Sequence, residues 1–359
     1  MKRIEWIDIA RGIGMLLIII GHSLFTYKFS LFNSFIFAVH VPLFFILSGY
    51  LFHEKPWKKI FQSGYFNLFL PYGITAIIIL LLVCFDKAVS NPITMSFAHN
   101  NIAEACKALI YGLGTPTSNG LFHQKFLAVG AVWFLLAMFI GNLIFKLLVL
   151  IAGKTRTGEA GLFVLSLICT YLGFFITPLV VLPWSANSAL ASQLFYWAGH
   201  MLRKHDVVER HNPLLQVIGL ALWIAAACTG FFYLNVPSAP HIWLAVLGAV
   251  GGCFVIMEVS KWLAEHSTKV VDWLAYYGRF SLVVLCAHLI DLDCLNIGGF
   301  IFGRLTYLGV NGILAAACTI IYRVLVTIIA LWLVPRIPLI RSMFMNRTYP
   351  FKFQGIYRK

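Results

Sequence analysis

The residues of this chain whose types and spacing are best suited to chemistry are Arg11 and His22, in the apolar stretch from Ile9 to Tyr27. Eleven positions make about three helical turns, so in a helix both side chains project from one face, about 16 Å apart along the axis. Ionisable groups on a membrane helix are costly, and they usually face a protein interior or a wet cavity where they serve function. The simpler alternative is that Arg11 anchors the helix at the interface and His22 bonds a neighbouring helix.

Histidine is suited to general-base chemistry at this position. Its ordinary pKa of about 6.5 is close to neutral pH, so the neutral ring can remove the proton of a hydroxyl group, which typically contributes about 10²–10⁴-fold in rate. Asp8 precedes Arg11 by three residues and is therefore placed to pair with it at the helix entrance. The sequence contains no Gly-x-Ser-x-Gly elbow or phosphate-binding glycine loop that would compete with this site.

Two further histidines lie in apolar stretches. His40 begins the segment HVPLFFILSGYLF, which also contains Ser48 and Tyr50, and His288 lies in GRFSLVVLCAHLIDLD. If the spans alternate in direction, these two histidines and His22 lie at comparable depth in the outer half of three separate spans. Each is either part of a site or a histidine whose hydrogen bonds join helices.

The scaffold that must position these residues is a polytopic membrane protein. Of 359 residues, 60% are hydrophobic and only 11% are charged, which predicts an all-α transmembrane helical bundle. The net charge is +14, and the charged residues lie between the apolar segments. We therefore interpret them as determinants of membrane topology, and we expect no nucleic-acid partner. The eight cysteines lie mostly in apolar runs without metal-ligand spacing, so we expect no metal site.

The hydrophobic pattern predicts about ten transmembrane helices, and the basic residues predict their orientation. Most of the 27 Lys and Arg residues fall on the side that also holds both ends of the chain, so the positive-inside rule predicts that both termini are cytoplasmic. We expect a transmembrane domain over 1–340 and a basic cytoplasmic tail over 341–359. A long outer loop, 87–125, either covers an acceptor site or is a solvated connector. The expected spans are 9–28, 32–52, 66–86, 126–150, 161–182, 186–203, 214–235, 240–262, 275–294 and 308–334.

Three pieces of the sequence together resemble the acyltransferase-3 family of integral-membrane acyltransferases. The first is Asp8 with Arg11-Gly12 and then His22, and the second is His40-Val41-Pro42-Leu43-Phe44-Phe45 running to Ser48-Gly49-Tyr50. The third is Trp133-Phe134-Leu135. The second piece resembles the corresponding motif of the sugar and polysaccharide O-acetyltransferases in the fucose 4-O-acetylase-like branch. The similarity extends along the whole chain.

The resemblance implies an O-acyltransferase, with acetyl-CoA or another acyl-CoA as the donor and a sugar, glycan or lipid-linked saccharide as the acceptor. It also implies a multi-pass protein of the bacterial cytoplasmic (inner) membrane, in contact with membrane lipid. His22 then matches the essential histidine of the family and Arg11 its essential arginine. Family members often carry further arginines before the equivalent of Pro71, where this chain has Lys58 and Lys59, followed by Gln62 and Asn67. These lysines would serve as point charges for the CoA phosphates.

The mechanism we expect places the donor at Arg11, with Lys58 and Lys59 as additional phosphate ligands, and uses His22 as general base. His40, Ser48 or Tyr50 would supply hydrogen bonds to the oxyanion, and Asp8, Trp133 and His288 would support the site. An acyl-enzyme on Ser48 or His22 is an open alternative. The rival function is a transporter or flippase for a glycan or lipid-linked intermediate, which would use the buried His and Arg as a proton or substrate relay. We find no inverted repeat that would favour it.

Overall fold

A computed structural model describes residues 4–25, 30–89, 101–121, 124–153, 156–295 and 297–345. Within these ranges the chain forms helices and no β-strand, which confirms the predicted all-α membrane bundle. The α-helices are α1 Glu5–Phe25, α2 Ser30–Val39, α3 Pro42–Tyr50, α4 Trp57–Gly64, α5 Leu70–Ala88, α6 Ile102–Tyr111, α7 Trp133–Ala152, α8 Arg156–Ile176, α9 Ala186–Ala191, α10 Gln193–Lys204, α11 Pro213–Thr229, α12 Ile242–Glu265, α13 Lys269–Arg279, α14 Ser281–Cys294, α15 Ile297–Tyr307, α16 Gly312–Leu333 and α17 Pro338–Phe344. A π-helical turn, η1 Tyr65–Phe69, joins α4 to α5, and 3₁₀ turns occupy η3 Gly130–Val132, η4 Pro183–Ser185 and η5 Val334–Arg336.

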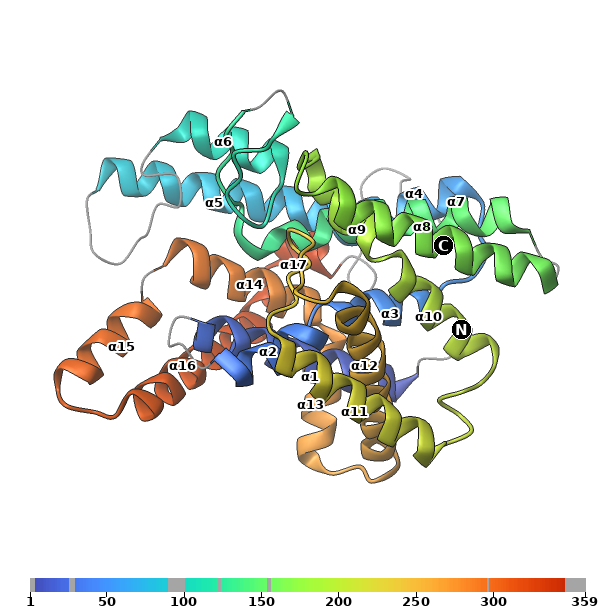
Figure 1. The fold of residues 1–359 in the computed structure, drawn as a ribbon. Coiled ribbons are helices and arrows are strands. Elements are labelled where there is room, and N and C mark those ends of the chain that lie inside the picture. The colour runs from blue at the N-terminus through green and yellow to red at the C-terminus, as the bar shows by residue number, and fades with distance from the viewer. Residues whose placement is uncertain are drawn as a thin grey trace.

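The helix α1 lies in the middle of the bundle. It contacts α2, α3, α12, α13, α14 and α16, which come from distant parts of the chain. Figure 1 shows α4, α5, α7 and α8 along one side of the molecule and α11, α12 and α13 along the opposite side, with α1, α2 and α3 between them. A helix with neighbours on all sides can hold polar side chains away from lipid, which an ionisable residue in a membrane span requires.

Seven helical segments of the described chain are long and apolar enough to cross a membrane. They coincide with seven of the ten predicted spans. These segments are Glu5–Leu24, Leu31–Tyr50, Trp57–Ala88, Gly130–Ala152, Thr157–Ile176, Ile242–Glu265 and Gly312–Arg336. The chain is therefore an integral membrane protein with several transmembrane helices.

The other three predicted spans are helical but differ from simple crossings. The sixth is divided between the short helices α9 and α10, and the seventh contains α11, an apolar helix of 17 residues. The ninth consists of α13 and α14, which meet at a bend of 75°. Phe280 lies at that bend with non-helical backbone angles. The total of ten crossings remains a prediction.

Glycine contacts allow α13 to pack closely against α1 just before the bend. A Cβ atom on Gly278 would overlap the carbonyl oxygen of Asp8 and the amide nitrogen of Gly12, and one on Gly12 would overlap the carbonyl of Leu274. The backbones of α13 and α1 therefore pack in direct contact, as small residues allow in membrane helix pairs. After this contact the chain turns at Phe280 and continues as α14. Hydropathy alone does not report such a turn.

Three loops on the side that is predicted to be outer are joined by hydrogen bonds where the structure describes them. Part of the predicted outer loop 87–125 is the helix α6, and the hydroxyl of Tyr111 at its end donates to the carbonyl of Val181 at 2.7 Å. The side-chain amide of Asn235 donates to the hydroxyl of Thr115. The backbone carbonyl of Asn235 accepts from the hydroxyl of Ser188 at 3.1 Å. These bonds join three loops that are far apart in sequence. The described part of the loop is thus tied to its neighbours, while 90–100, 122 and 123 lie outside the described residues.

Both ends of the described chain lie at one cavity. Ile4, which precedes α1, and Phe344 and Met345, at the end of α17, all line it. The two ends therefore lie on the same side of the bundle, while their cytoplasmic location remains a prediction. Residues 341–345 of the predicted tail belong to α17 and its end, and residues 346–359 lie outside the described part of the chain.

Candidate functional site

The helix α1 carries both residues of the predicted arginine–histidine pair. It runs unbroken from Glu5 to Phe25, so Arg11 and His22 lie on one helix, as their spacing predicts. Asp8 Oδ1 lies 3.6 Å from Arg11 Nη1, and the Asp8 side chain is 8% exposed whereas that of Arg11 is 32% exposed. The buried carboxylate therefore holds a guanidinium that remains accessible to a ligand.

Three histidines from distant parts of the chain meet at the other end of α1. His22 Nδ1 lies 3.3 Å from His288 Nε2 on α14, and the two rings are nearly parallel, with centroids 5.5 Å apart and an interplanar angle of 12°. The ring of His40 lies 6.1 Å from that of His22 at an angle of 83°. The structure thus brings together the three histidines that the sequence places at comparable depth.

His40 lies at the break between α2 and α3. Pro42, which lacks a backbone N–H, begins α3, where the first turn tolerates this loss. The Nδ1 atom of His40 lies 3.0 Å from the carbonyl oxygen of Ile36. Because a carbonyl only accepts, Nδ1 must donate, and in the neutral ring the proton is then absent from Nε2. A neutral His40 therefore has no second N–H to offer to an oxyanion.

A polar network joins α1, α14 and α16 beside the histidines. Arg323 of α16 donates from Nη1 to Oγ of Ser23 at 3.0 Å, and its Nε lies 3.6 Å from Oδ2 of Asp291. The hydroxyl of Tyr322 donates to Oδ1 of the same carboxylate at 2.7 Å. Ser23 follows His22 directly, and Asp291 lies one turn beyond His288. The network therefore fixes the two helices against each other at the level of the histidine pair.

A cavity of about 720 Å³ lies on the side of the bundle where the described ends meet. It is bounded by α1, α3, α4, α7, α14 and α17, and its volume is in the range of about 300–1,000 Å³ that is typical of small-ligand sites. Along α1 it extends from Ile4 to Ile18, which is about 21 Å at 1.5 Å per residue. Three Lys and Arg residues line it: Arg11, Lys55 and Arg279.

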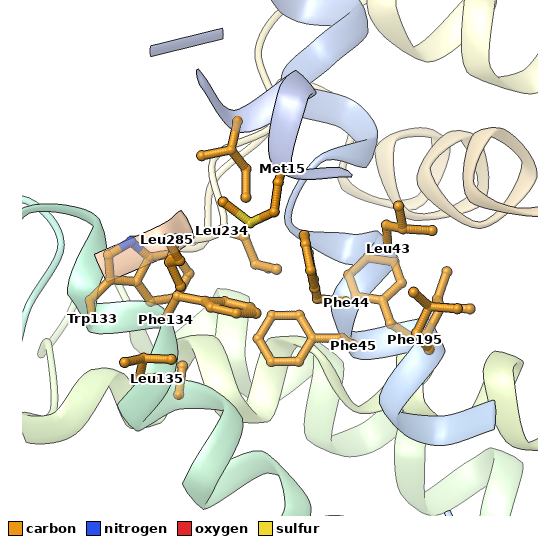
Figure 2. Close-up of a cluster of buried hydrophobic side chains, with 14 of the residues drawn as sticks. Met15, Leu43, Phe44, Phe45, Trp133, Phe134, Leu135, Phe195, Leu234 and Leu285 are labelled. Atoms are coloured by element: carbon orange, nitrogen blue, oxygen red, sulfur yellow. The ribbon is translucent and has the colours of Figure 1, made fainter. Parts of the chain in front are cut away.

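The deep end of the cavity is apolar and lies one helical turn from the histidine pair. Ile18 lines it on α1, four residues before His22, and Leu285 lines it on α14, three residues before His288. Phe44 and Phe134 also line it, with ring centroids 5.7 Å apart. Figure 2 shows these two rings together with Met15 and Leu285 in the buried cluster that forms this end.

Of the remaining predicted site residues, Ser48 lines the cavity, and the others lie outside its lining. Ser48 lines the cavity and donates to Oδ1 of Asn142 at 3.0 Å. Tyr50 is buried away from it, with its ring 5.4 Å from the guanidinium carbon of Arg203. Trp133 is buried at the start of α7, against Gly114 of the predicted outer loop. Lys58 and Lys59 are exposed on α4 and are absent from the cavity lining.

Sequence reasoning missed three residues that the structure places at or beside the site. Arg279 and Lys55 line the cavity, but in the sequence they resemble the other basic residues that flank spans. Arg323 is 9% exposed. The sequence signal that could have identified it is an arginine in the middle of an apolar span. Among the described residues, no group of three or more His, Cys, Asp or Glu side chains is arranged to hold a metal ion.

Comparison with known proteins gives one match. The acyltransferase-3 family model, described as an acyltransferase domain, matches residues 4–332. No curated protein and no solved structure matches the chain.

Proposed function

The chain belongs to the acyltransferase-3 family of membrane acyltransferases, and on this premise we propose that it transfers an acetyl group from acetyl-CoA to a hydroxyl of a sugar, glycan or lipid-linked saccharide. The observation that carries the proposal is the position of two residues on α1. Arg11 lines the cavity, and His22 lies one turn beyond the cavity's deep end. One rigid helix thereby links a basic donor site to a base.

The cavity fits the two chemically different parts of an acyl-CoA. Arg11, Lys55 and Arg279 offer positive charge for phosphate groups, and guanidinium groups bind phosphate with paired hydrogen bonds. The pantetheine arm is long and carries amide groups, and Ser48, Ser63, Asn67 and Asn142 line the wall that it would follow. Lys58 and Lys59 are exposed nearby on α4 and contribute to the positive field that attracts the donor.

The thioester would reach the apolar end of the cavity beside Ile18 and Leu285. His22 takes the proton of the acceptor hydroxyl while the hydroxyl oxygen bonds to the thioester carbonyl carbon. The carbon–sulfur bond then breaks, and the acyl group remains on the oxygen as an ester. The proton passes from His22 to the departing sulfur, which leaves as the free thiol of CoA. Each step uses groups that the donor, the acceptor and His22 supply.

The acceptor would approach His22 from the outer end, because the donor fills the cavity at the other end. A group of aromatic rings lies beside His22: Phe37 lies 6.2 Å from His22 between ring centroids, and Phe231 and Tyr233 lie 5.6 Å and 6.2 Å from Phe37. Aromatic faces are apolar surfaces with defined geometry, and the C–H faces of sugar rings pack against such surfaces. This supports a saccharide as the acceptor.

The test is acyl transfer by the purified protein in nanodiscs. Radiolabelled acetyl-CoA is offered with a panel of sugars and lipid-linked saccharides, and both the labelled ester and the released thiol are measured. We expect the wild type to form ester and His22→Gln to be slower by about 10²–10⁴-fold, while its elution volume and melting temperature match the wild type. Transfer at the wild-type rate by His22→Gln would contradict the proposal, as would folded wild type that binds no acetyl-CoA.

A further inference from the structure

We infer that His288 is a positioning residue, which holds the proton of His22 on Nδ1 and thereby leaves Nε2 of His22 as the base. The inference rests on the proposed acyl transfer, and it concerns how the base is prepared for that reaction. It starts from one contact, the 3.3 Å between His22 Nδ1 and His288 Nε2. Only one proton can lie between two nitrogen atoms, so one ring donates and the other accepts.

Burial decides which of the two histidines meets the substrate. The His288 side chain is fully buried, with 0% of its surface exposed, whereas His22 is only half-buried. His22 therefore keeps some surface that a hydroxyl group could contact, whereas His288 has none in this arrangement. Because His288 already occupies Nδ1 of His22, the acceptor has access only to Nε2.

The direction of the hydrogen bond follows from the task of His22. A base must present a lone pair, so Nε2 of His22 must carry no proton before the reaction. The proton of the neutral ring is then on Nδ1, which donates to Nε2 of His288, and His288 carries its own proton on Nδ1. The opposite direction would place a proton on Nε2 of His22 and make it a donor. A partner that selects the tautomer of a catalytic histidine is a general device of such sites.

The surroundings of His288 hold its ring at this distance. His288 lies on α14, one turn before Asp291, and Asp291 is joined through Arg323 to Ser23, the neighbour of His22. The two helices are therefore connected directly beyond the histidine contact. Within the described chain, Nδ1 of His288 has no hydrogen-bond partner, so the contact with His22 is the ring's one hydrogen bond there.

The unpaired Nδ1 also makes the inference testable by mutation. Removing a buried polar atom that lacks a partner does not leave a further group unsatisfied in its place. An apolar residue of similar size at position 288 leaves only Nδ1 of the half-buried His22 without its partner, so the variant should still fold. His288→Met and His288→Gln form a matched pair, because the two side chains have the same length and differ in the amide group. The Gln side-chain oxygen can accept a hydrogen bond near the place of Nε2, whereas Met cannot.

The kinetic test compares these two variants with the wild type. For His288→Met we expect kcat to fall about 10²-fold, within the range of general-base assistance, with an unchanged KM for acetyl-CoA because the donor cavity is intact. For His288→Gln we expect most of this loss to be restored. Equal activity of both variants and the wild type would overturn the inference. Equal loss in both, or a loss expressed in KM, would indicate a merely structural role and would also overturn it.

A spectroscopic test separates this inference from the proposed function. Histidine labelled with ¹⁵N is incorporated into the protein in nanodiscs, and the His22 resonances are assigned from their loss in His22→Gln. We expect a protonated Nδ1 and an unprotonated Nε2 in the wild type, and a mixture of tautomers in His288→Met. A protonated Nε2 in the wild type, or an unchanged spectrum in His288→Met, would overturn the inference. These outcomes do not depend on acyl transfer, so failure of the proposed function is recognised separately by the transfer assay.

Discussion

Arg323 of α16 donates a hydrogen bond at 3.0 Å to Ser23 of α1, the residue that follows His22. The same guanidinium lies 3.6 Å from the carboxylate of Asp291, which is 2% exposed. A single buried side chain thus joins the helix of the proposed base to the helix of its partner His288. This arrangement makes Arg323 a structural requirement of the histidine pair.

We predict that Arg323→Met destabilises the protein by about 3–5 kcal/mol, because it leaves the buried carboxylate of Asp291 without its cation. Tyr322→Phe removes only one hydrogen bond to Asp291 and should cost about 1 kcal/mol. Arg304→Met is the matched control, since Arg304 is exposed on α15 and its loss should change stability by less than about 0.5 kcal/mol. Thermal unfolding in nanodiscs measures all three. Equal stability of the Arg323 and Arg304 variants would refute the role of the network.

The second prediction concerns Ile18 at the deep end of the cavity. Ile18→Trp should fill this end and prevent the thioester from approaching His22, so acyl transfer is lost. CoA without an acyl group should still bind, because the basic residues of the cavity are unchanged. Ile18→Leu conserves volume and should retain activity, with a stability change below about 1.5 kcal/mol. Transfer at the wild-type rate by Ile18→Trp would show that the donor does not use this part of the cavity.

The third prediction separates Arg279 from the other basic residues near the cavity. Arg279→Gln should raise KM for acetyl-CoA about ten- to a hundredfold without lowering kcat. This corresponds to a charged hydrogen bond of about 1.5–3 kcal/mol that holds donor and transition state alike. Lys58→Gln removes a charge of the same sign from a residue outside the cavity lining and should change KM less than the Arg279 variant. Steady-state kinetics at two salt concentrations measure both. A larger effect at Lys58 would place the phosphates on α4.

The fourth prediction tests the contact between α1 and α13. Gly278→Ala places a Cβ atom against the backbone of Asp8 and Gly12, and neither backbone can move as a side chain would. We expect a loss of stability of about 1–3 kcal/mol, together with a higher KM for acetyl-CoA because Arg279 is displaced. Gly73→Ala is the control, since nothing lies within 4 Å of its added Cβ. Within α5 it should be neutral or stabilising, by up to about 1 kcal/mol. The melting temperatures of both variants test this prediction, and equal values for Gly278→Ala and Gly73→Ala would contradict it.

The sequence predicts the membrane fold and the pair on α1 because ionisable residues stand out in an apolar stretch. Spacing within one helix is fixed by its geometry, so the relation of Arg11 to His22 can be read directly. The contact between His22 and His288 spans 266 positions, and similar depth on two spans does not specify a distance of 3.3 Å. Only the packing of α14 against α1 brings these rings together.

Other features escape sequence reasoning for different physical reasons. Arg279 looks like a topology signal until the bend at Phe280 places it at the cavity. That bend is invisible in hydropathy, because α13 and α14 together remain apolar enough for one span despite Arg279 and Ser281 at the bend. The helix α15 was not predicted, since its 11 residues are too few for a span. His40 shares the depth of His22, but its hydrogen bond to Ile36 limits the chemistry of its neutral ring.

The most direct test of the central claim compares donor binding with acyl transfer in His22→Gln and Arg11→Gln. The claim is that α1 divides these tasks between its two ends. Binding of acetyl-CoA is measured by calorimetry in nanodiscs, and transfer is measured under single-turnover conditions at saturating donor. We predict that His22→Gln binds acetyl-CoA like the wild type and transfers about 10²–10⁴-fold more slowly, whereas Arg11→Gln binds weakly and recovers transfer when donor is raised. Unchanged transfer by His22→Gln, or unchanged donor affinity of Arg11→Gln, would contradict the account.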